Sequence, residues 1–207
     1  MKRKIILFVF GLILFVVFLA GCYTVKNETI KGNGNVIDQE RQVERFDRIV
    51  LSGVGNMNVY PAENYRVVVT TDSNIQDYVV VKTSNNILTL TLKPGINIDQ
   101  PTESTQFKFD VYLPVLKSVN MEGVGKIIIS AGNTSDLEIY FSGVGSIDSQ
   151  NYQVQNVTIT HSGVGNATIW ATNSINVNFS GIGDIRYKGN PKINVNRWSG
   201  IGDIRFL

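Results

Sequence analysis

A short motif, Gly-x-Gly between apolar stretches, occurs six times in this chain and constrains its fold more than any other feature. The first glycines of the six copies are Gly53, Gly123, Gly143, Gly163, Gly181 and Gly200. After one gap of 70 residues, the steps between copies are 20, 20, 18 and 19 residues. A repeat of this length indicates an architecture in which each copy stacks on its neighbours to bury an apolar face.

Aligning the copies on their glycines places apolar, mostly β-branched residues at alternate positions, which is the period of a strand with one buried face. One column holds Leu51, Met121, Phe141, His161, Phe179 and Trp198, so His161, the only imidazole of the chain, is expected to be an interior ring. Another column, between the glycines, holds Val54, Val124, Val144, Val164, Ile182 and Ile201. We therefore expect an all-β fold, a right-handed parallel β-helix (solenoid) with about 18–20 residues per turn and an inserted β region in the N-terminal half.

The paired glycines fit a sharp bend or bulge in each strand, because glycine adopts backbone angles that cost other residues free energy. The structural bend motif is thus expected at Gly53, Gly55, Gly123, Gly125, Gly143, Gly145, Gly163, Gly165, Gly181, Gly183, Gly200 and Gly202.

The N-terminus has the features of a secretory signal, with three basic residues, an apolar stretch over 5–20 and small residues before a cysteine. The ending Leu19-Ala20-Gly21-Cys22 resembles the lipobox of bacterial lipoproteins, which implies lipidation of Cys22 and cleavage before it. We expect residues 1–21 to be a lipoprotein signal peptide, 22–45 a lipidated N-terminus and flexible tether, and 46–207 the β-helical domain. The alternative is an ordinary signal anchor with an incidental cysteine.

Composition excludes several function classes. Without residues 1–21 the chain has 16 basic and 17 acidic residues, so no nucleic-acid partner is expected. A single Cys and a single His leave no disulfide framework and no Cys/His metal cluster, and no cofactor is expected. Asp184 and Asp203 raise the question of a calcium site, but Arg186 and Arg205 are placed to form ion pairs with them.

The sequence also lacks the motifs of common enzymes. It has neither a Gly-Lys-Ser/Thr phosphate loop nor a Gly-x-Ser-x-Gly nucleophile elbow, so we expect no catalysis. Strand alternation predicts that Tyr140, Tyr152 and Trp170 point outward and form a contact surface for a protein or glycan. Trp198 and Phe206 are expected to cap the last repeat, or to lend its apolar end to self-association through the C-terminal repeat.

The repeated SGVGN and SGIGD segments, together with FDRIVLSGVGNMNV and TLTLKPG, resemble the head GIN domain family of putative auto-transporter adhesins over about residues 44–207. The resemblance implies a right-handed β-helix in the cell envelope or on the cell surface, and it carries over no catalytic residues. We expect a lipid-anchored, extracytoplasmic, adhesin-like module that faces outside the cytoplasm and binds macromolecules or glycans.

Two other functions stay open. One is a scaffolding or sensory module in cell-envelope stress signalling, acting on a membrane partner. The weakest is a β-helical enzyme that cleaves polysaccharides, because such enzymes need clustered charges and the outward columns here are mostly Ser, Asn and Thr.

Overall fold

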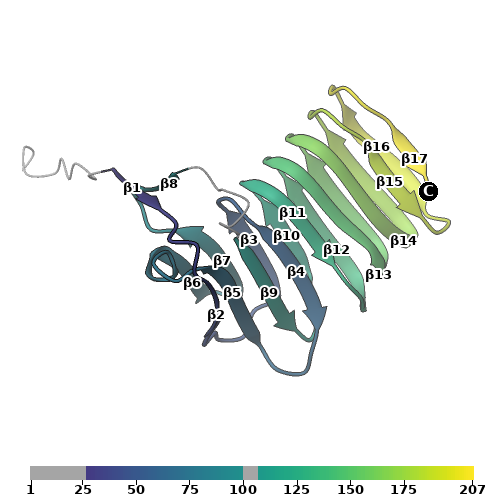
Figure 1. Ribbon diagram of the computed structural model, residues 1–207. Coiled ribbons are helices and arrows are strands. Elements are labelled where there is room, and N and C mark those ends of the chain that lie inside the picture. Colours follow the sequence, from purple (N-terminus) through teal and green to yellow (C-terminus); the bar gives the residue numbers. More distant parts are fainter. Residues whose placement is uncertain (1–26, 100–106) are drawn as a thin grey trace, which may run out of the picture.

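The computed structural model describes residues 27–99 and 107–207, and these form strands with one short 3-10 helix (Figure 1). The N-terminal part contains β1 (Glu28–Lys31), β2 (Val36–Arg41), β3 (Arg48–Ser52), β4 (Asn56–Pro61), β5 (Arg66–Asp72), η1 (Gln76–Tyr78), β6 (Val79–Ser84), β7 (Ile87–Leu92), β8 (Ile96–Asp99) and β9 (Lys108–Leu113). The C-terminal part contains β10 (Ser118–Met121), β11 (Val124–Ile129), β12 (Asn133–Phe141), β13 (Val144–His161), β14 (Val164–Phe179), β15 (Ile185–Lys188), β16 (Lys192–Trp198) and β17 (Ile204–Phe206). No helix in the described residues has the length and apolar character to cross a membrane.

The prediction of a right-handed parallel β-helix is wrong. Fifteen strands form one mixed sheet, in which β2, β5, β9, β4, β11, β13, β12, β10, β3, β7 and β6 follow one another and β14–β17 continue from β13. The pairs β2–β5, β5–β9 and β6–β7 are antiparallel, and the other pairs in this sheet are parallel. Because β13 pairs with both β11 and β12, the sheet folds back around the core and becomes nearly closed and barrel-like.

The physical reason for the error lies between the first two copies of the motif. This region supplies strands to the same sheet as the repeats, and hairpin-like antiparallel pairing there changes the strand direction. The 20-residue spacing reports only on the C-terminal half, where neighbouring copies do pair in parallel. Figure 1 shows these C-terminal strands side by side, ending at β16 and β17.

The repeats pair in register, so the alignment on glycines holds in space. Gly125 lies opposite Gly145, and Gly145 lies opposite Gly165. The ring of His161 is fully buried between Phe141 and Phe179, with centroid distances of 4.4 and 4.9 Å, which confirms its interior position.

The column between the glycines differs from the expected burial. Its members are 47–72% exposed and form an aliphatic ridge of Val54, Val124, Val144, Val164, Ile182 and Ile201. Buried Leu51 and buried Met57 are six residues apart, so alternation through the motif places Val54 on the opposite, outward side of the strand, and the same holds in the other copies.

The N-terminal boundary differs as well. Strand β2 lies inside the 22–45 segment that the sequence predicts to be a flexible tether, yet it pairs along its length with β5. Residues 28–31 of the same segment pair with β8. The proposed signal peptide and Cys22 lie outside the described residues.

The glycines of the motif are required by close backbone contact. A Cβ built on Gly143 would overlap the carbonyl oxygen of Gly123, and one on Gly145 would overlap that of Gly125. The second glycine of the motif also has a positive φ, 140° at Gly145. Any side chain at these positions would push neighbouring strands apart.

We predict that Gly143→Ala lowers the free energy of unfolding by about 2–4 kcal/mol, because the strands must separate to admit the methyl group. Gly53→Ala is the matched control: it occupies the same position of the first copy, but its nearest atom would be 3.9 Å from the Cβ. It should cost no more than about 1 kcal/mol. Urea denaturation of both variants tests this, and equal losses would contradict the account.

Candidate binding face

Two tyrosines on neighbouring strands form a stacked pair on the outer surface of the sheet. Tyr60 on β4 lies opposite Tyr112 on β9, with ring centroids 5.1 Å apart and ring planes inclined by 23°. The Arg66 guanidinium on β5 lies 4.1 Å from the centroid of the Tyr112 ring. The three side chains make one row across the sheet, stabilised by aromatic stacking and a cation–π contact.

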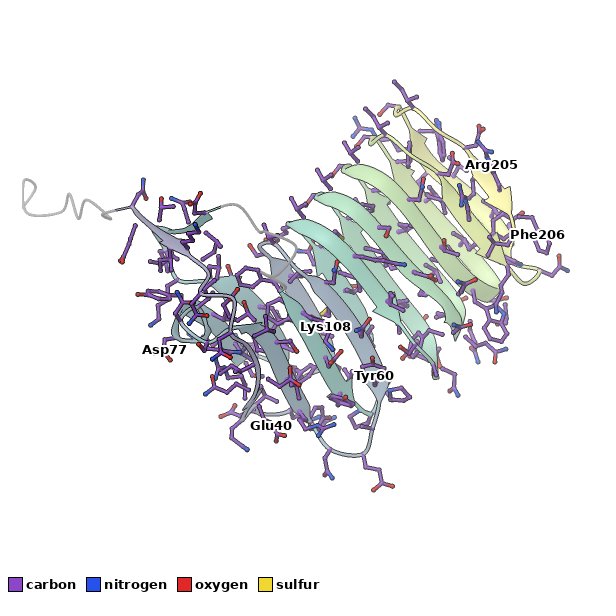
Figure 2. All side chains as sticks on the ribbon, viewed as in Figure 1. Glu40, Tyr60, Asp77, Lys108, Arg205 and Phe206 are labelled. Atoms are coloured by element: carbon purple, nitrogen blue, oxygen red, sulfur yellow. The ribbon has the colours of Figure 1, made fainter. Side chains whose placement is uncertain are left out.

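A row of polar groups runs beside the tyrosines. Asn58 lies opposite Asp110 and donates an Nδ2 hydrogen bond of 2.9 Å to its carboxylate. The Lys108 amine lies 2.9 Å from the other oxygen of Asp110. We call Tyr60, Tyr112, Arg66, Asn58, Asp110 and Lys108 the tyrosine face; Figure 2 shows Tyr60 and Lys108 on this side of the sheet.

The electrostatics keep Lys108 and Tyr60 in their usual charge states near neutral pH. The hydrogen bond to Asp110 raises the pKa of Lys108, so its amine stays charged. Burial, followed by the charge of Asp110, raises the pKa of Tyr60, so its phenol stays neutral and can donate a hydrogen bond.

A groove of about 500 Å³ adjoins the tyrosine face. Its lining contains both apolar and polar residues: Val54, Gly55, Asn56, Asn58, Phe107, Lys108, Val124, Gly125, Lys126 and Ile128. Asn58 and Lys108 belong to both the groove and the face. A ligand that lies in the groove can therefore reach the polar row and approach the tyrosine rings.

The arrangement has groups that can contact a sugar. Flat aromatic rings offer apolar surface to a sugar ring, and the amide, carboxylate and amine beside them can exchange hydrogen bonds with its hydroxyls. The only imidazole of the chain, His161, is buried in the core and cannot serve as a base at this surface.

Sequence reasoning missed this face, although a signal for it was present. The tripeptides Asn58-Val59-Tyr60 and Asp110-Val111-Tyr112 have the same pattern, a polar residue and a tyrosine on one side of a strand with valine on the other. Only the pairing of β4 with β9 shows that the two tripeptides lie side by side.

The three aromatic residues predicted to form a contact surface do not come together. Tyr152 is 4% exposed, so the prediction that it points outward is wrong. Its hydroxyl donates to the carbonyl of Leu116 at 2.9 Å and accepts from the amide of Leu116 at 3.0 Å. The register of β13 shifts between Ser149 and Gln153, and this irregularity reverses the side of the strand on which Tyr152 lies.

Tyr140 and Trp170 lie on separate parts of the surface. Tyr140 on β12 is 42% exposed and lies opposite Thr160. Trp170 is partly buried, with the Lys188 amine 3.9 Å from its ring centroid, and lies opposite Gln153. Gln153 in turn lies opposite Asn133, seven residues before Tyr140 on β12, or about 23 Å of strand.

The aspartates of the last two motif copies have structural partners. The Asp184 carboxylate accepts the backbone N–H of Asp203 at 3.1 Å, just as Asn166 accepts the N–H of Asp184 at 2.8 Å. Arg205 lies 3.4 Å from Asp184 and 3.1 Å from Asp203, and Arg186 lies 3.7 Å from Asp184, which confirms the expected ion pairs. Across residues 27–99 and 107–207, no three His, Cys, Asp or Glu side chains gather where they could hold a metal ion.

The sequence matches the model of the family described as "Putative auto-transporter adhesin, head GIN domain" over residues 45–131 and 118–191. The chain belongs to this family. The two matches together span most of the described chain, including the tyrosine face and five of the six glycine motifs. No curated protein matches the sequence.

Several solved structures are similar to this chain, and the first of those below shares its fold. A putative adhesin from Bacteroides fragilis is 23% identical, with a TM-score of 0.60 over 86% of this chain and 100% of that chain. A putative cell adhesion protein from Clostridium sporogenes is 16% identical, with a TM-score of 0.47 over 83% of this chain and 99% of that chain. A putative lipid binding protein from Parabacteroides distasonis is 19% identical, with a TM-score of 0.45 over 87% of this chain and 100% of that chain.

The burial of His161 predicts a pH-dependent stability. Its Nε2 lies 2.8 Å from the Gly165 carbonyl, its Nδ1 has no hydrogen-bond partner in the described structure, and burial lowers its pKa below the ordinary 6.5. Below about pH 6.5 the unfolded chain binds a proton that the folded chain does not, so the free energy of unfolding falls as pH decreases and is fully retained above that pH.

His161→Phe removes the titrating group while keeping an aromatic ring in the stack. We expect denaturation curves between pH 8 and 5.5 to show a smaller loss of stability for this variant than for the wild type. If both proteins lose the same free energy over this range, the imidazole does not govern the pH response.

Proposed function

We propose that this protein is an adhesin-like binding module of the bacterial cell envelope that contacts glycans or other macromolecules through the tyrosine face. The observation that carries the proposal is the stacked pair Tyr60–Tyr112 beside the hydrogen-bonded row of Asn58, Asp110 and Lys108. Membership of an adhesin-named family supports a binding role and a location outside the cytoplasm.

The face has the usual make-up of a surface that binds by contact. Rigid aromatic side chains lose little conformational entropy on binding, and Tyr and Arg are the residue types enriched at binding hot spots. The polar row is already held in place by internal hydrogen bonds, so a ligand would not have to order it. The adjoining groove gives a linear ligand a path across several strands.

We also propose that the protein is anchored to a membrane by a lipid on Cys22. This rests on the sequence Leu19-Ala20-Gly21-Cys22 after an apolar stretch. The anchor would hold the binding face near the membrane while leaving it open to the medium.

We predict that Tyr60→Ala and Tyr112→Ala each weaken glycan binding at least about tenfold, because a stacking ring is lost. The wild type is first screened on a glycan array, and titration calorimetry with a bound glycan then compares the variants. Tyr140→Ala is the matched control, since Tyr140 is an exposed tyrosine on another part of the sheet. Unchanged affinity in both tyrosine-face variants, with folding intact by circular dichroism, would refute this face as the site.

For the anchor, we expect Cys22→Ser to abolish incorporation of a fatty-acid label and to release the mature protein from the membrane fraction. Metabolic labelling and cell fractionation measure both effects. A labelled, membrane-bound Cys22→Ser protein would rule out lipidation at this residue.

A further inference from the structure

The last repeat has an uncovered apolar end. Among the described strands, β16 pairs only with β14, and β17 pairs only with β15. Val195 is 50% exposed and Trp198 36% exposed, although Val177 and Phe179, their partners in the preceding repeat, are fully buried. Val195 and Trp198 thus point the same way as their buried partners, and no described strand covers them.

Other exposed apolar side chains lie at this end besides Val195 and Trp198. Phe206 and Leu207 are 66 and 50% exposed and belong to the same repeat as Val195 and Trp198. From the usual sizes of these four side chains, about 400 Å² of apolar surface faces outward there, comparable to the largest patches on monomeric proteins, which are often functional. Figure 2 shows Phe206 and Arg205 at this end of the molecule.

Addition of a further strand is an unsuitable way to cover this end. The register of β16 against β14 shifts after Val195, which leaves Asn196 as an extra residue in a bulge. Arg197 and Lys192 are exposed on the same edge strand, and β17 has only three residues. Bulges, charges and short strands all hinder pairing along an edge. The partner must therefore pack against the side chains of the apolar end.

We propose that a second copy of this chain packs its own last repeat against this end, forming an end-to-end dimer with twofold symmetry. At the other end of the molecule the sheet ends in two strands of different character: β2 exposes Asp38 and Glu40 and buries no apolar residue, and β6 exposes Lys82 and Ser84. Such edges are a poor match for the apolar end, so a head-to-tail chain of copies is disfavoured and a closed, symmetric pair is favoured.

The size of the apolar end sets the expected strength of the dimer. A standard stable interface buries about 800 Å² per partner, and the roughly 400 Å² of apolar surface would make the central part of it. The exposed polar residues Asn196 and Arg197 on β16 would supply a rim. We therefore expect a dissociation constant in the micromolar range.

The charges at this end predict how salt acts on the dimer. Arg205 is paired with Asp203 at 3.1 Å, whereas Lys192 and Arg197 have no ion-pair partner among the described residues. In a symmetric pair these lysines and arginines approach their equivalents, so screening by salt removes repulsion. Dimerisation should therefore strengthen as salt increases.

Sedimentation equilibrium of the purified full chain in density-matched detergent tests the proposal, with protein from about 1 to 200 μM. We expect a monomer–dimer equilibrium that tightens between low and high salt. The double variant Phe206→Lys with Leu207→Lys should raise the dissociation constant at least about tenfold, because it places charges in the apolar contact. Tyr140→Lys, a charge placed on an exposed tyrosine elsewhere, should leave the equilibrium unchanged.

Three results would overturn the proposal: a monomer at all concentrations, a dimer that the double variant does not weaken, or assemblies that grow beyond two copies. Both substituted side chains are largely exposed, so the double variant should fold, and circular dichroism checks this. Glycan binding by the tyrosine face is measured separately, so a failed dimer and a failed binding function are distinguishable.

Discussion

The structure depends on bare backbone at the bend of each repeat. At every motif glycine from Gly123 onward, a Cβ would overlap the carbonyl oxygen of the corresponding glycine in the preceding copy. Glycine thus permits the strands to keep parallel register while the sheet turns a corner, which no other residue would allow at this distance. The stacked core residues are aligned because the bends are aligned.

The same constraint explains which parts of the fold could be predicted from the sequence. Where the motif recurs every 18–20 residues, alignment on glycine correctly placed Phe141, His161 and Phe179 in one buried stack. Between Gly55 and Gly123 no motif marks the bends, and strand direction there is decided by long-range pairing. The antiparallel strands β5 and β6 contain no copy of the glycine motif. The sequence therefore does not show that they run against their neighbours, and the predicted architecture is wrong.

The candidate site also depends on strand pairings that the sequence does not show. Tyr152 was placed by strict alternation, which fails where β13 shifts register as it passes from one side of the sheet to the other. Tyr60 and Tyr112 are 52 positions apart in the sequence and become neighbours only through the β4–β9 pairing. Single-strand patterns can show which side of a strand a residue takes, but they cannot show which strands lie together.

The asparagine or aspartate after the motif has a consequence for how the protein can vary. Asn56, Asn166 and Asp184 each accept the backbone N–H of the equivalent residue one copy further on, whereas Lys126 and Ser146 hold this position in the two copies between them. Repeats that carry this acceptor therefore present the same contact to the next repeat. Gain or loss of one repeat in the C-terminal half would change the length by about 4.8 Å while leaving β4 and β9 untouched. Reach and recognition can then evolve independently in this fold.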